Sequence, residues 1–72
     1  MNNEMMARKF SVFKKTGIRV HIDCYNGDFY NGSVFDIGED YVIIDDRKLG
    51  WTPIMFCEIK GQPQKMKESK DE

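Results

Sequence analysis

One group of side chains that could bind an anionic ligand stands near the start of the chain. Five cations stand in residues 1–19 against the single acid Glu4: Arg8, Lys9, Lys14, Lys15 and Arg19. Residues 23–46 carry seven acids and no Lys or Arg. A group of cations can bind phosphates without reading base sequence, and it is equally typical of a solvated helix surface. The formal net charge of −1 excludes a globally basic nucleic-acid binder.

Few residues suit catalysis or metal binding. His21 is the only histidine, and Cys24 and Cys57 are too far apart in the sequence for a metal-binding CxxC pair. No nucleophile elbow or phosphate-binding loop is present. We therefore predict a protein that is not an enzyme and that needs no cofactor or metal. The two cysteines could pair, but we expect buried free thiols in a reduced, cytoplasmic protein.

The length of the chain limits how it can be stabilised. Seventy-two residues form one domain, and a domain of this size buries only about 60% of the surface that its unfolded chain exposes. Such domains usually need disulfides, a metal or partner subunits. We therefore expect self-association. The apolar run at residues 41–44 is far shorter than the ~20 residues of a membrane span, so we expect no membrane contact.

The first element expected is a helix. Met6, Phe10 and Phe13 recur at helical spacing, with most of the cations on the other side. This pattern predicts a short amphipathic helix over about residues 4–15. Gly17 is well placed to end it, because glycine adopts the left-handed conformation that often follows a helix.

A hairpin is expected after the helix. Residues 18–25 alternate between apolar and polar side chains, which is typical of a half-buried strand. Asn26-Gly27 then predicts a type I′ turn, because both residues tolerate positive φ. The second strand runs over about 28–37. Gly32 lies inside it, where glycine often marks a bulge or a sharp bend.

Three more short strands complete the expected domain, over residues 41–45, 52–56 and 59–62. The fold class is therefore mainly β, with an N-terminal helix followed by a five-stranded, strongly bent antiparallel sheet. SH3-like, OB and Sm-like small barrels all fit this description. We assign the domain to residues 1–63, with the barrel over about 17–62. Residues 64–72 are predicted to form a charged, flexible tail.

Order and spacing add a family resemblance. Three stretches carry it: Gly17-Ile-Arg-Val-His-Ile-Asp-Cys-Tyr-Asn-Gly27, Tyr30-Asn-Gly32 and Ile37-Gly-Glu-Asp-Tyr-Val-Ile-Ile44. The chain resembles the Sm-like (Sm/Lsm) family over about residues 10–62, and most closely its bacterial Hfq branch. Residues 53–59 are similar to the last two strands of that family.

The resemblance implies a homo-oligomeric ring of five to seven subunits. The fourth strand of one subunit would pair with the fifth strand of the next, which would use four residues: Thr52, Ile54, Phe56 and Ile59. It also implies binding of single-stranded RNA, through the loop after the second strand and the loop between the last two strands. Matching positions there are Asp40, Tyr41 and Phe56.

Each of these positions also has a structural interpretation. Tyr41 could stack on a base or lie half-buried in its strand, and Phe56 could stack or pack at an interface. Asp40 could accept a hydrogen bond from a base edge or be a solvated turn acid. The matching second loop, residues 55–57, has no cation, whereas the family carries Arg-Gly or Tyr-Lys-His there.

We therefore predict RNA binding with weak base selectivity, in which phosphate contacts from the helix dominate: Arg8, Lys9, Lys14 and Lys15. The alternative is a structural or assembly ring that has lost RNA binding, for instance one encoded by a virus or a mobile element.

Overall fold

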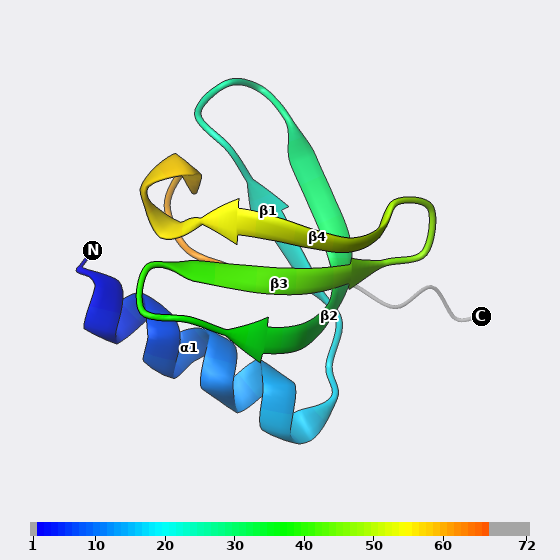
Figure 1. Cartoon of the computed structure of the whole chain (residues 1–72), viewed down its shortest axis with the longest axis horizontal. Helices are drawn as coiled ribbons and strands as arrows, with labels where there is room; N and C mark the ends of the chain where they lie inside the picture. The colour runs from blue at the N-terminus through cyan, green and yellow to red at the C-terminus, as the bar shows by residue number, and fades with distance from the viewer. Residues whose placement is uncertain (1, 67–72) are drawn as a thin grey trace.

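The structure, a computed structural model, describes residues 2–66 and consists of one helix and a five-stranded antiparallel sheet (Figure 1). The elements are α1 (Asn3–Thr16), β1 (Val20–Asp23), β2 (Phe29–Ile37), β3 (Tyr41–Asp46), β4 (Gly50–Met55), the 3₁₀ turn η1 (Phe56–Glu58) and β5 (Gln64–Lys65). The strand order is β4-β3-β2-β1-β5, so β4 and β5 are the edges. This confirms the mainly-β class with its N-terminal helix. The sheet is open, which corrects the expectation of a barrel over about residues 17–62.

The helix begins and ends where its sequence signals stand. The side chain of Asn2 accepts a hydrogen bond of 2.8 Å from the N–H of Met5, which satisfies a donor that the first turn leaves free. At the other end Gly17 has a φ of 73°, and its N–H donates to the carbonyl of Phe13 at 2.9 Å. The predicted helix over about 4–15 is therefore confirmed, with one more residue at each end.

The core lies between α1 and the sheet. Met6 and Phe10 are the buried residues of α1, and the Phe10 ring stacks on Phe56 with centroids 5.8 Å apart. Figure 1 shows α1 lying beside the sheet, where most of its contacts with strands are with β2. The remaining buried apolar side chains come from β1 to β4 and from the bridge between residues 24 and 59: Val20, Ile22, Cys24, Val34, Val42, Ile44, Ile54 and Ile59. Full burial of such a side chain contributes about 1.5–3 kcal/mol each.

The hairpin turn differs from the predicted type I′ turn. Gly27 has a φ of 95°, but Asn26 does not have positive φ, and the N–H of Gly27 donates to the carbonyl of Cys24 at 3.0 Å. The loop is thus of the three-residue class that ends in a left-handed glycine. The Asn26 side chain explains the difference, because its Oδ1 accepts from the N–H of Asp28 at 2.9 Å and its local bond favours negative φ.

β2 changes its partner half-way along. Val20 of β1 pairs with Gly32, whereas Asp45 of β3 pairs with Ser33, the next residue. A Cβ at Gly32 would overlap the carbonyl oxygen of Asp45 and lie 2.6 Å from the side chain of Ile44. Glycine is therefore required by the close approach of β3, and Figure 1 shows that β2 is strongly bent. A β-bulge follows between residues 34 and 36.

The last strand is shorter and later than predicted. Ile59 forms an isolated bridge with Cys24, after which Gly61 has a φ of 74° and Pro63 cannot donate to a ladder. Pairing with β1 resumes only at β5, within the predicted tail. The predicted strand over 59–62 is therefore wrong for residues 60–62, and β5 lies within residues that were assigned to the tail. Residues 67–72 lie outside the described part of the chain.

Both cysteines are free, but only one is buried. Cys24 lies in the core, and Cys57 is exposed on η1, which corrects the expectation of two buried thiols. Burial, together with the nearby acids Glu58 and Asp28, raises the pKa of the Cys24 thiol, which therefore stays protonated near neutral pH. Within residues 2–66, no helix has the length and apolar character needed to cross a membrane.

The bend of β2 makes a prediction for stability. Gly32→Ala should lower the free energy of unfolding by about 1–3 kcal/mol, because the added methyl group has no space beside β3. Urea denaturation followed by circular dichroism measures this change. Ser33→Ala is the neighbouring control and should cost less. An unchanged Gly32→Ala protein would show that β3 does not approach β2 this closely.

Candidate nucleic-acid interface

The predicted loop residues meet at one end of β3. The N–H of Phe56 donates to the carbonyl of Asp40 at 2.8 Å, and the N–H of Gly38 donates to the carbonyl of Tyr41 at 2.8 Å. Tyr41 is half-buried with its ring over Gly38, and Asp40 is exposed. Phe56 is only 4% exposed and stacks on Phe10, which leaves its ring no free face for a base.

The predicted interface residues are mostly core residues. Ile54, Phe56 and Ile59 are at most 4% exposed, and Thr52 is half-buried. These side chains therefore stabilise the single chain. What this region offers to a neighbour is the unpaired backbone of β4 and β5, since both are sheet edges.

The predicted helix cations do not form one group. Arg8 lies 3.7 Å from an acid one turn earlier on α1, and Lys14 lies 3.8 Å from Asp36 of β2. Arg8 and Lys15 are about two turns apart and share the solvent side of α1. Lys9 is half-buried. Exposed ion pairs of this kind contribute little to the free energy of folding. The four cations do not all lie on one side of the helix, so they do not form a single binding surface.

A cleft at the other end of β3 combines cations with an exposed aromatic ring. Its volume is about 420 Å³, and we call it the basic cleft; it is lined by Arg19, Phe29, Asn31, Asp46, Arg47, Lys48 and Leu49. Three of these residues are cations and one is an acid. Phe29 is 61% exposed. Cations around an open aromatic face can hold a phosphate while a planar base stacks on the ring.

Asp46 shapes the loop that presents two of the cations. Its carboxylate accepts hydrogen bonds from the N–H groups of Lys48 at 2.8 Å and Leu49 at 3.1 Å. These bonds hold the pKa of Asp46 below its usual value, and the bond from Leu49 has the largest effect. The carboxylate is therefore ionised and bonded to the backbone of its own loop, with Arg19 nearby, which leaves Arg47 and Lys48 to face a ligand.

The floor of the basic cleft is tied to His21. The ring of His21 places Nδ1 2.7 Å from Oδ1 of Asn31 and Nε2 2.9 Å from Oδ1 of Asp23. Both ring nitrogens thus face oxygen acceptors, which favours the imidazolium. The bond to Asn31, and then those to Asp23, raise the pKa of His21. With its oxygen engaged, Asn31 has its amide N–H groups available to a ligand.

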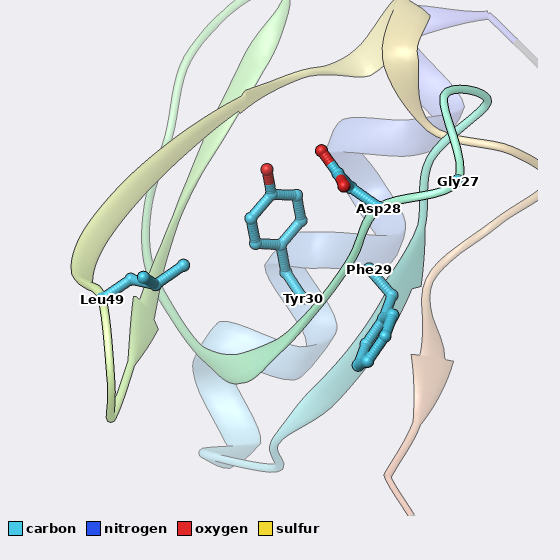
Figure 2. Close-up of a pocket in the computed structure, with 5 residues that line it drawn as sticks. All are labelled: Gly27, Asp28, Phe29, Tyr30 and Leu49. Carbon is cyan, nitrogen blue, oxygen red and sulfur yellow. The ribbon is translucent and has the colours of Figure 1, made fainter.

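A second hollow adjoins the basic cleft and shares two of its residues. Gly27, Asp28, Phe29, Tyr30 and Leu49 line it, and its volume is about 330 Å³. Figure 2 shows Tyr30 and Leu49 facing each other across this hollow, while Phe29 points the opposite way. Burial, together with Asp28, raises the pKa of Tyr30, so its hydroxyl is a neutral hydrogen-bond group near pH 7.

The basic cleft was not predicted from the sequence. Arg19 was counted among the N-terminal cations, and Arg47 and Lys48 were given no role. The available signal was two adjacent cations in a loop between two strands, directly after a carboxylate that can bond to the loop backbone. Their position beside Phe29 follows from the bend of β2, which local patterns do not report.

Comparisons with known proteins do not assign the chain to a family. No family model, curated protein or solved structure matches it. Within residues 2–66, no three His, Cys, Asp or Glu side chains come together as metal ligands would. A function must therefore be argued from the geometry of the basic cleft and from the residues that carry the Sm-like resemblance.

The contacts of His21 predict a pH dependence. Because its pKa is raised in the folded protein, its stabilising contribution should be complete below about pH 6.5 and should be lost as pH rises through the raised pKa. The free energy of unfolding should thus fall over this range, and His21→Gln should flatten the fall. NMR titration of the ring protons should give a pKa that Asp23→Asn lowers and the control Glu39→Gln does not. A His21 pKa at or below about 6.5 would contradict the described contacts.

Proposed function

We propose that this protein binds single-stranded RNA with weak base selectivity through the basic cleft. The observation that carries the proposal is the exposed ring of Phe29 beside three cations. Proteins that bind single strands without sequence preference combine a positively charged groove with aromatic rings on which bases stack. The stretches that resemble the Sm-like family favour RNA as the ligand.

The residues of the basic cleft would make different kinds of contact with the RNA. Arg19, Arg47 and Lys48 would contact phosphates, because they are the cations that line it. Phe29 would stack on a base through its free face. The amide N–H groups of Asn31 would donate to a base carbonyl or a phosphate oxygen, since its oxygen is engaged by His21. Only this last contact can read a base, which is why the selectivity is expected to be weak.

We also propose that the protein assembles into a ring of five to seven subunits through β4 and β5. Both are sheet edges with one side unpaired. The N–H of Phe56 points to β3, and strand alternation then turns the N–H groups of residues 51, 53 and 55 away from it. Pro53 has no N–H, and that of Met55 faces Glu58 Oε1 at 3.4 Å. The free edge of β4 is thus rich in acceptors and suits an edge that supplies donors.

Such a ring would repeat the basic cleft once per subunit and let several clefts hold one strand. The weak affinity of one exposed site would then be raised by effective concentration. A ring without measurable RNA affinity would instead support the structural or assembly module as the function.

The RNA proposal predicts a distinct pattern of mutant effects. Arg47→Ala with Lys48→Ala should reduce the slope of log affinity against log salt by up to about 1.4, at about 0.7 per phosphate contact on a single strand. Phe29→Ala should cost about 1–3 kcal/mol of binding free energy through lost stacking. Fluorescence anisotropy with labelled oligo-U and oligo-A, between about 50 and about 200 mM salt, measures both.

Matched controls separate the basic cleft from the helix. Lys14→Ala with Lys15→Ala removes the same charge from α1, and Phe35→Ala removes an exposed ring outside the cleft; both should bind nearly as the unaltered protein does. If the helix variant loses as much affinity as the cleft variant, or if no binding is seen at low salt, the cleft is not the RNA site.

The ring proposal is tested through one backbone donor. The N–H of Met66 donates to the carbonyl of Arg19, so the N–H of Lys65 points away from β1, toward the side on which a neighbour would pair. Light scattering should give a discrete mass of five to seven subunits. Lys65→Pro, which removes this donor, should shift the protein toward smaller species, whereas Lys65→Ala should not. A monomer at micromolar concentration before any substitution would refute assembly.

A further inference from the structure

An aromatic pair stays exposed on the outer face of β2, β3 and β4. The rings of Phe35 and Trp51 stack with centroids 4.3 Å apart and an interplanar angle of 21°. Phe35 is 44% exposed and Trp51 is 67% exposed. Phe35 is the residue at the bulge of β2, where the pairing with β3 shifts register. The bulge lets its ring reach across β3 to Trp51 on β4. Figure 1 shows β3 lying between β4 and the last part of β2.

A carboxylate lies beside this aromatic pair. Asp45 of β3 is the cross-strand partner of Trp51 on one side and of Ser33 on the other, and cross-strand partners share a face of the sheet. Asp45 is exposed. Within the described part of the chain, no Lys, Arg or His forms an ion pair with it. Asp36, next to Phe35, is paired with Lys14 at 3.8 Å, so Asp45 is the acid that this face offers to a ligand.

This combination selects a planar cation. An aromatic face attracts a cation through its quadrupole, and guanidinium also stacks on rings and forms paired hydrogen bonds with a carboxylate. The Asp45 carboxylate repels a nucleic-acid backbone, so stacking of RNA on this face is disfavoured. Of the chain's three arginines, Arg8 pairs on its own helix, while Arg19 and Arg47 line the basic cleft.

We propose that Phe35, Trp51 and Asp45 form a docking site for an arginine side chain of another protein. The site lies outside the basic cleft and does not depend on RNA binding. The guanidinium would stack on the exposed aromatic face, and its N–H groups would donate to the Asp45 carboxylate. The partner is recognised by an exposed arginine in a segment that carries no acids of its own.

Trp51 gives a direct test, because it is the only tryptophan and its emission reports on this face. The probe is a short capped peptide of alternating glycine and arginine, with the same peptide in lysine as the comparison. The arginine peptide should change the emission in a saturable way and bind about two- to fivefold more tightly than the lysine peptide. Asp45→Asn should weaken it about two- to fivefold, and Phe35→Leu should remove the preference for arginine.

Controls keep the test specific to these residues. Asp40→Asn makes the same charge change at an exposed turn, and Phe29→Leu removes an exposed ring in the basic cleft; neither should alter peptide binding. Equal binding of the two peptides, or equal effects of Asp45→Asn and Asp40→Asn, would overturn the proposal by showing general charge attraction.

Two further outcomes would assign the face to another occupant and so overturn the proposal. A change of Trp51 emission with protein concentration alone, reduced by Arg8→Ala, would indicate a second copy of the chain. Quenching by oligo-U that Phe35→Leu abolishes would indicate RNA. Because the peptide test contains no RNA, its result is independent of whether the basic cleft binds RNA.

Discussion

The change of partner along β2 is the constraint on which the rest of the structure depends. Gly32 is the last residue paired with β1, and Ser33 is the first paired with β3. The two ladders can meet at adjacent residues only because Gly32 has no Cβ to strike the backbone of Asp45. Because β3 pairs only with the second half of β2, the residues beside Asn31 and Phe29 are the end of β3 at Asp46 and the loop that follows it. This arrangement creates the basic cleft.

Local signals in the sequence predicted the elements well and their long-range arrangement less well. The helix was predictable because Met6 and Phe10 mark its buried side and Gly17 its end. The last strand was not, since the register beside β1 slips between Ile59 and β5. The turn class at Asn26 was missed because a side-chain bond to Asp28 competed with its tolerance of positive φ.

The candidate site was harder to predict, for a physical reason. The proposed stacking residue Phe56 has the aromatic character that RNA binding needs, but its partner is Phe10, and the core holds the ring. Phe29 alternates with polar residues along β2 and is exposed. The cations around it come from the linker before β1 and from the loop after β3. The bend of β2 brings these residues together, and the sequence of neither the linker nor the loop predicts this contact. The fold thereby separates a basic surface around Phe29 from an acidic, aromatic surface around Trp51.

The central claim is that RNA lies in the basic cleft, on Phe29, and photocrosslinking tests it most directly. An oligo-U strand carrying 4-thiouridine can be irradiated with the protein, and the crosslinked peptides identified by mass spectrometry. The account predicts crosslinks at Phe29 and in the loop that carries Arg47 and Lys48. Crosslinks confined to α1, or to the turn that holds Asp40 and Tyr41, would contradict it.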